Sequence, residues 1–452
     1  MARTLALGGA LATGLAPVAW GAEGNNDRAQ RLEQQVRQLQ ARVAELERSE
    51  DGQWMSERRA EEVKALVHEV LADARTRSSL LQEGATAGYD GGFFIQSPDQ
   101  SFRLKLGGQI QTRYIWNHRD GARDADPDED DNEAGFQMRR VKIKGGGHIA
   151  DPRLSYAFII AGNRSDGGAI VEAFTLGYDL TDNLSITAGR MKAPFALQEL
   201  TSSSRQLAVE RSSVHDTFTL NYTEGVMLSY NAGRFRLAGM VNDGANGDRT
   251  DFHEDAVDVA FSGRAVARLA GDWGQLKDPA VAWAGDDTGL FLGGGVHYQV
   301  GETGEDMING DFLRWTADAT FESNGFGVLA ALYGNHTDMD AGTDFDDYGL
   351  LVEAGYFLVP DEIQPFVRYE LILQDDARPD VAAGNSDEET SLITAGVNWY
   401  QRKHSAKFTA DVVYGLDPLR SIVNTSSGLG LRTDAPEEDG QVAFRAQYQL
   451  TF

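Results

Sequence analysis

The chain has 452 residues, with 50 Gly, 11 Pro and no Cys, and its formal net charge is −28. The absence of Cys excludes disulfides, thiolate metal sites and a lipid anchor on Cys. Beyond residue 22 there is no apolar run of about 18 residues, which excludes a helical membrane span. A β-barrel remains possible, because its strands need only about ten residues with every second one apolar.

Residues 1–22 resemble an export signal. Arg3 is the only early charge, and an apolar stretch rich in Ala, Leu and Gly follows it. Ala19, Gly21 and Ala22 are small enough to form a cleavage site. We therefore expect a secretory signal peptide that is removed from the mature protein. The alternative is an apolar N-terminus without a targeting role.

Residues 26–83 carry a heptad pattern. Leu32, Val36, Leu39, Val43 and Leu46 are spaced by four, three, four and three residues, with charged residues and Gln between them. This seam predicts an α-helical coiled coil, which needs partner helices to cover its apolar stripe. A break at Asp51-Gly52 leaves one long helix or two short ones equally open, and the oligomer order is not fixed. We interpret residues 84–100 as a linker.

From residue 101 the hydrophobic period changes to two. In residues 101–117 the even positions are mostly apolar, whereas the odd positions are basic or carry amides. Such a strand has one face suited to lipid and one suited to water. Tyr114 and Trp116 lie near one end, where an aromatic girdle would meet the membrane surface.

Sixteen segments follow this rule, which predicts an all-β fold, a 16-stranded antiparallel transmembrane β-barrel over residues 101–452. Short and long connections tend to alternate, as in bacterial outer-membrane barrels. One connection, 270–288, is longer than its place predicts. An even strand number puts both barrel ends and the coiled coil on the periplasmic side. The expected strands are 101–116, 140–149, 154–160, 170–178, 184–192, 225–230, 234–242, 258–269, 289–299, 312–321, 326–334, 347–358, 363–373, 391–400, 406–414 and 441–452.

Acidic residues crowd three expected loops, around residues 120–133, 243–255 and 375–389. Such loops could bind divalent cations and lipopolysaccharide, or could be solvated without a ligand. The eight His show no metal-ligand spacing, and no hydrolase, nucleotide or zinc-protease motif occurs. Ser202–Ser204 near His215 and Asp216 are interpreted as a polar loop. We therefore expect no enzyme activity, cofactor, metal or nucleic-acid partner.

Alternation gives the predicted inner wall more bases than acids. Rings of Arg and Lys lower the barrier for anions in a narrow pore. The alternative is that these bases pair with acids of an inserted loop and only stiffen the barrel. The candidate pore-lining residues are Arg103, Lys105, Arg113, Arg140, Lys142, Lys144, Arg234, Arg236, Arg264, Arg268 and Arg314.

The connection 193–224 is the candidate constriction. It is long and less acidic than the other long loops, and it carries Phe195, Leu197, Leu200 and Phe218. Apolar residues in a long loop favour packing, and folding into the bore would bury them. An ordinary external loop over its neighbours is the alternative. Its charged candidates are Arg205 and Arg211, with Glu199 opposing them.

A set of spaced motifs runs through the chain: 102–108, 136–145 with Arg139-Arg140, 189–195 followed by 201–203 and Glu210-Arg211, 396–400 and the terminal Phe452. Together they resemble the phosphate-selective porins of the O and P type, over roughly residues 95–452. The resemblance implies a trimeric 16-stranded outer-membrane channel whose third loop folds inward and whose basic residues guide anions. One departure matters: where the archetype has lysines in that loop, this chain has Glu199 and Ser204, so strict phosphate selectivity is not implied.

Together these patterns predict an outer-membrane porin for passive diffusion of small solutes that leans toward phosphate or other small inorganic or organic anions. The expected partners are two further copies in a homotrimer, outer-membrane lipid with lipopolysaccharide, and peptidoglycan through the coiled coil. The alternative is a structural tether or adhesin with a plugged barrel, in which the coiled coil and external loops are the working parts.

Overall fold

The computed structural model describes residues 85–119, 130–163, 167–247, 257–301, 310–420, 428–434 and 439–452. The chain divides into two units, Met1–Glu83 and Gly84–Phe452, and the second holds all the described residues. The predicted signal peptide and coiled coil therefore lie outside the described residues. Within the described ranges, no helix has the length and apolarity to cross a membrane.

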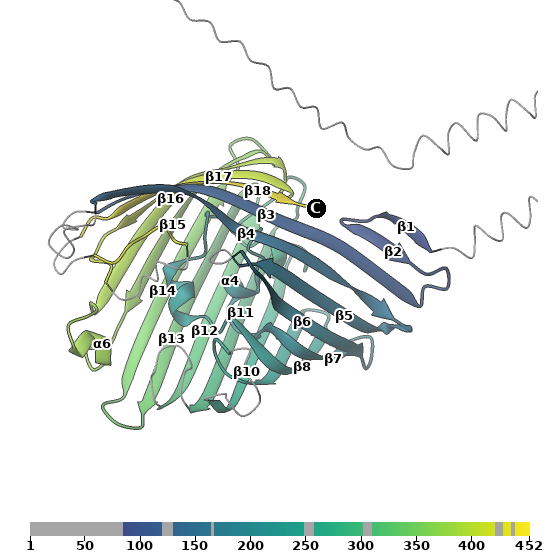
Figure 1. Ribbon diagram of the computed structural model, residues 1–452, viewed down its shortest axis with the longest axis horizontal. Coiled ribbons are helices and arrows are strands. Elements are labelled where there is room, and N and C mark those ends of the chain that lie inside the picture. The colour runs from purple at the N-terminus through teal and green to yellow at the C-terminus, as the bar shows by residue number, and fades with distance from the viewer. Residues whose placement is uncertain are drawn as a thin grey trace, which may run out of the picture. The chain divides into compact units, whose positions relative to one another are not determined.

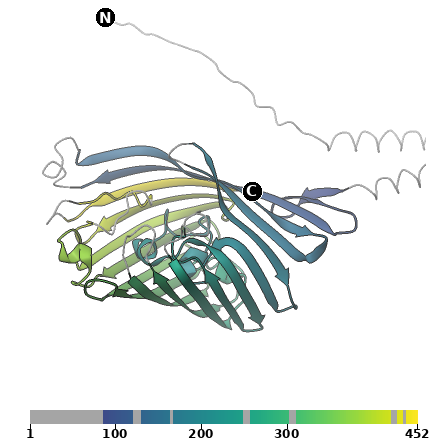
Figure 2. The ribbon, with the colours of Figure 1, turned by 60° about the horizontal axis from the view of Figure 1, so that its bottom comes forward.

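The second unit is a closed antiparallel barrel of sixteen strands, β3 to β18 (Figures 1 and 2). Each strand pairs with the next, and β18 pairs with β3, for example Gln447 opposite Arg113. The predicted fold class is confirmed in its barrel part. The strands are β3 (Phe102–His118), β4 (Asn132–Ile149), β5 (Asp151–Gly162), β6 (Ala169–Asp179), β7 (Leu184–Lys192), β8 (Tyr222–Ala232), β9 (Phe235–Asn242), β10 (Val257–Ala270), β11 (Gly289–Gly301), β12 (Gly310–Ser323), β13 (Phe326–Met339), β14 (Phe345–Tyr356), β15 (Ile363–Leu373), β16 (Glu389–Arg402), β17 (Ala406–Gly415) and β18 (Val442–Thr451).

The side chains of β3 alternate between the two faces as the sequence predicts. Gln109, Gln111 and Arg113 are buried on the inner face, whereas Ile110 on the outer face is 36% exposed. The same alternation continues through β12 to β18. Exposed Leu, Val, Phe and Tyr on the outer face form the apolar surface that lipid would cover.

A short hairpin precedes the barrel where the sequence analysis placed a linker. Its strands are β1 (Thr86–Tyr89) and β2 (Phe93–Gln96), drawn in purple in Figure 1. β2 pairs with residues 103–106 of β3, whereas β18 pairs only with residues 109–118. The hairpin therefore covers the part of the β3 edge that β18 leaves open, and an unpaired strand edge is a liability.

Three connections fold into the bore. Residues 193–221 contain two short helices, α4 (Leu197–Leu200) and α5 (Ser213–Phe218). Residues 271–288 contain the 3-10 turn η1 (Gln275–Lys277), and their inward course explains why this connection is longer than its place predicts. The described parts of 416–441 bury Leu419, Leu429 and Leu431.

These connections cover only part of the inner wall. An apolar core joins Phe195, Leu207 and Phe218 of the first connection to Trp283 of the second and to inner-face side chains of β12 to β16, such as Tyr333. Inner-face residues from β10 through β18 are mostly buried. Many inner-face residues of β5 to β9 remain half-buried or exposed, including Ala157, Thr175 and Ser229. We call the inner faces of β10–β18 the covered wall and those of β4–β9 the open wall.

Candidate functional site

The inserted connection 193–221, called the inner loop below, is fixed by its apolar side chains. Phe195, Leu197, Leu207 and Phe218 are buried, and Phe218 stacks on Tyr333 of β13 with ring centroids 5.6 Å apart. Ser212 accepts a hydrogen bond from the backbone N–H of His215 and so caps α5. The apolar residues that made this connection a constriction candidate are therefore those that hold it inside the bore.

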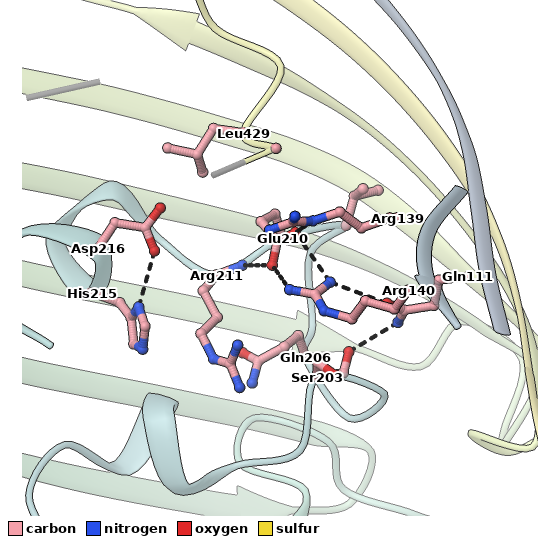
Figure 3. Close-up of polar contacts among 12 residues, drawn as sticks. Gln111, Arg139, Arg140, Ser203, Gln206, Glu210, Arg211, His215, Asp216 and Leu429 are labelled. Carbon is pink, nitrogen blue, oxygen red and sulfur yellow. Dashed lines mark hydrogen bonds and ion pairs between the residues drawn. The ribbon is translucent and has the colours of Figure 1, made fainter. Parts of the chain in front are cut away.

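Glu210 of the inner loop lies within a cluster of three arginines, of which Figure 3 labels Arg139 and Arg140. Its carboxylate is 2.6 Å from Arg140, 2.8 Å from Arg139 and 3.0 Å from Arg113. Burial alone would raise the pKa of Glu210, but the positive charges of these arginines hold that pKa well below its usual range. The loop is thus tied to β3 and β4 by an ionised carboxylate.

A β-bulge allows two successive arginines to reach that carboxylate. Gln111 of β3 pairs with Arg140, but Thr112 pairs with Met138, so Arg139 has no opposite residue. The extra residue re-aims a side chain that strict alternation would send outward. Alternation alone therefore found Arg140 and missed Arg139; the paired Arg139-Arg140 sequence was the available hint.

The bulge in β6 has the same effect on a carboxylate. Ile159 pairs with Ala173 and Ile160 with Val171, which leaves Glu172 unopposed. Glu172 accepts two hydrogen bonds from Lys142, at 2.5 and 2.6 Å. Sequence alternation did not identify Glu172, because a one-residue bulge leaves no clear trace in the pattern.

Glu199 lies at the beginning of the inner loop and differs from its expected role. It is buried, with its carboxylate 3.0 Å from Lys192 and 2.5 Å from His215. Burial would raise the pKa of Glu199, but Lys192, Arg211 and His215 hold it well below the usual range. The carboxylate fastens the loop to β7 instead of facing the bore.

Arg211 and Arg205, the other constriction candidates, are also engaged. Arg211 donates hydrogen bonds to the carbonyls of Gln198 and Thr201 within the loop, both at 3.0 Å. Arg205 forms an ion pair with Asp278 of the connection 271–288 and keeps part of its side chain exposed. Arg211 therefore stabilises the loop, whereas Arg205 links the loop to the connection 271–288.

The covered wall holds the loop through its backbone carbonyls. Arg264 of β10 donates to the carbonyl of Phe195 at 2.6 Å, and Arg314 of β12 donates to that of Thr219 at 3.1 Å. Asn398 of β16 and Lys407 of β17 donate to the carbonyls of Leu207 and Gln206, each at 2.8 Å. Polar inner-face side chains satisfy loop carbonyls that water cannot reach.

The predicted pore-lining residues thus fall into three groups. In the first group, Arg264 is paired with Asp318 at 2.8 Å, Lys142 with Glu172, and Arg113 and Arg140 with Glu210, while Arg314 donates to the carbonyl of Thr219. Lys144 and Arg236 have no carboxylate within ion-pair distance in the described ranges; Lys144 donates to Gln109 at 2.8 Å. The remaining four lie at the rims: Arg103 pairs with Asp90 of the hairpin, Lys105 lies beside the hairpin glycines, Arg268 contacts Asp272, and Arg234 is exposed in the β8–β9 turn.

Arg234 therefore departs from the expectation that it lines the wall. The alternating pattern predicts a strand that begins at residue 234, but β9 begins at Phe235. Gly233 adopts a positive φ of 53° and closes a tight turn that leaves Arg234 outside the ladder. The neighbouring Arg236 points inward, over the ring of Trp273 at 4.2 Å.

The matching family model is that of phosphate-selective porin O and P, over residues 110–415. The chain belongs to this family. The family and the barrel together indicate an outer-membrane channel, and the predicted resemblance is confirmed. A curated relative, an uncharacterised protein of Aquifex aeolicus (strain VF5), is 24% identical over 292 residues. That match spans 59% of this chain and 64% of the relative, which is less than two thirds of its length.

Solved structures of porins share the fold. An anion-selective porin from Comamonas acidovorans has a TM-score of 0.53 at 15% identity, covering 77% of this chain and 99% of that one. In-vitro folded OmpT of Vibrio cholerae has a TM-score of 0.52 at 15% identity, covering 81% and 99%. The outer-membrane channel DcaP of Acinetobacter baumannii has a TM-score of 0.51 at 12% identity, covering 77% and 97%.

In this porin the described residues contain no group of three or more His, Asp or Glu arranged to hold a metal ion. The inner loop lies beside the open wall, and cations of β3, β4 and β9 lie around it at different depths.

Proposed function

We propose that this porin allows passive diffusion of small solutes across the outer membrane and favours anions. The supporting observation is the charge balance where the inner loop meets the open wall. Five cations lie there, Arg113, Arg139, Arg140, Lys142 and Lys144, against the carboxylates of Glu210 and Glu172 and the nearby Asp216. The excess positive charge in a narrow, low-dielectric passage concentrates anions and repels cations.

The proposed preference is for anions in general. No ring of lysines encircles the described inner loop. Glu199 is paired with Lys192 and His215, and the carbonyl of Ser204 accepts a hydrogen bond from Gln449. The surplus charge lies instead on one side of the passage, at β3 and β4. A one-sided field attracts an anion without surrounding it, so it favours charge sign over a particular oxyanion.

The test is the reversal potential of the purified porin in a planar bilayer under a KCl gradient. We expect chloride to be more permeant than potassium. Lys144→Glu should move the reversal potential toward the equilibrium potential of potassium. Arg234→Glu is the matched control, because it makes the same charge change at an exposed turn outside the passage. A cation-selective wild-type channel would contradict the proposal.

The remaining parts of the proposal concern assembly. We propose a homotrimer in outer-membrane lipid, with acidic external loops toward lipopolysaccharide. Residues 1–22 would be removed on export, and residues 26–83 would form a periplasmic coiled coil that could reach peptidoglycan. Cross-linking of the full chain in outer-membrane fractions, compared with a variant lacking residues 26–83, would test both the oligomer and the role of the helical segment.

A second candidate is the structural tether or adhesin. It is favoured by one observation: the covered wall is packed by three inserted connections, as in a plugged barrel. Folded oligomers that show no conductance steps in a bilayer would support the tether. Stable single-channel steps would support the porin.

A further inference from the structure

A cavity of about 490 Å³ lies where the open wall meets the covered wall, and its lining differs from the rest of the passage. It lies between the inner loop, the inner faces of β8–β10 and the turn η1. Its volume is in the range of small-molecule sites, which are about 300–1,000 Å³. Asn231, Arg236 and Lys277 place it toward the short-turn rim of the barrel.

The charged groups of the cavity are all cationic. Arg205, Arg236, Arg264 and Lys277 line it, and no Asp or Glu is among the lining residues. Arg264 and Arg205 are paired with Asp318 and Asp278, but no carboxylate lies within ion-pair distance of Arg236 or Lys277 in the described ranges. Two cations are therefore available to a bound anion.

Apolar side chains also line the cavity, although an inorganic anion would gain nothing from contact with them. Leu197, Leu200, Met227, Val266 and Leu276 line it. Leu200 is 40% exposed, although the other apolar side chains of the inner loop are buried. Covering an exposed apolar side chain inside a water-filled passage with an apolar solute is favourable, because it removes apolar surface from water.

Trp273 lines the cavity together with these cationic and apolar side chains. The Arg236 guanidinium lies over its ring at 4.2 Å, and that of Arg268 at 5.5 Å. Stacking fixes the plane of a guanidinium and leaves its N–H edge free to donate to a carboxylate. Arg236 is thus held in place while one hydrogen-bonding edge remains available.

We propose that this cavity binds aromatic carboxylates, with the carboxylate at Arg236 and Lys277 and the ring against Leu200, Leu276 and Trp273. The inference rests on the proposed passage of anions and names one class of solute for it. It also assigns Trp273 and Leu200 a part in selecting solutes with an apolar body over inorganic anions of the same charge.

The test uses the full-length porin and three probes: benzoate, acetate (charge without a ring) and benzyl alcohol (a ring without charge). Binding is measured by calorimetry in detergent and, separately, by reduction of chloride conductance in a bilayer. We expect benzoate to bind about tenfold or more tightly than either other probe, because only it uses both the charge and the apolar lining.

Arg236→Ala should weaken benzoate binding about tenfold or more, the usual range for one charge-assisted contact. Arg234→Ala, two residues away in the exposed turn, is the control and should leave binding unchanged. Should Arg236→Ala fail to fold, Leu200→Ser keeps every charge and should weaken benzoate binding while sparing acetate.

Equal affinity for benzoate and acetate would overturn the inference, as would identical binding by the Arg236 and Arg234 variants. Because calorimetry does not require conduction, benzoate binding by a channel without anion selectivity would reject the proposed function and retain the binding site. An anion-selective channel that does not distinguish benzoate from acetate would do the reverse.

Discussion

The covered wall and the open wall have the same alternating pattern but different charge states. On the covered wall Arg264 pairs with Asp318, Arg368 with Glu353 and Arg445 with Asp411, all at 2.7–2.8 Å. On the open wall Lys144 and Arg236 have no such partner in the described ranges. The number of inward bases therefore overstates the charge that a solute meets.

The reason is solvation. An unpaired charge removed from water costs several kcal/mol, so the arginines under the inserted connections must be paired or bonded to carbonyls. A cation beside water keeps its hydration and can remain unpaired at little cost. Which wall a connection covers thus decides whether an inward base stabilises the barrel or acts on passing ions.

The largest effect is expected from removing the carboxylate that the three arginines share. Glu210→Gln leaves Arg113, Arg139 and Arg140 without their shared carboxylate. Removing one partner of a buried ion pair costs about 3–5 kcal/mol. We expect a lower temperature of heat-modified migration, and larger and noisier single-channel conductance as the inner loop loosens.

Glu172→Gln is the control for that experiment. It removes a carboxylate with a single Lys partner on the open wall, so its effect on thermal stability should be smaller. Wild-type stability and conductance in the Glu210 variant would mean that apolar packing alone holds the loop.

The contrast between the two walls depends on which face of each strand points into the barrel and which face meets lipid. Leu332, near the middle of β13, is 49% exposed on the outer face. Leu332→Arg should destabilise the barrel by about 2–4 kcal/mol, because the charge would face hydrocarbon near the midplane. Leu332→Met is the matched control, and urea unfolding in lipid vesicles is the measurement. An Arg variant as stable as the Met variant would mean that this face is not in contact with lipid.

Much of the barrel could be predicted from the sequence, because strand alternation directly reflects which face meets lipid. The segment 184–192 coincides with β7, and the inner loop was identified from its apolar residues. The rest depends on information that alternation does not carry. Two one-residue bulges redirect side chains, one in β4 at Arg139 and one in β6 at Glu172, which reaches Lys142. Whether an inward base is paired depends on connections far away in the chain, as with Glu210 and Arg113.

The contrast can be sharpened by removing one lysine from each wall. Lys144 is half-buried on β4, whereas Lys407 is buried on β17 and donates to the carbonyl of Gln206. Lys144→Gln should lower the ratio of chloride to potassium permeability by roughly a factor of two or more, since a single unpaired charge near a constriction changes the local potential. Lys407→Gln should leave that ratio unchanged. Equal shifts in the two variants would show that the covered wall also faces the passage.

The smallest expected effect is that of pH. The folded-state pKa values of Glu199 and Glu210 lie well below their usual range, so each contributes stability that is present above the ordinary Glu pKa of about 4.3. That contribution is lost only as the pH falls through the lower folded-state pKa. The contribution of these two carboxylates to heat-modified migration should therefore be constant from about pH 8 to pH 5, because both remain ionised throughout that range. A loop that loosened near pH 6 would require a different titrating group, and a pH series on the Glu210→Gln variant would show whether the change arises at the arginine cluster or elsewhere in the bore.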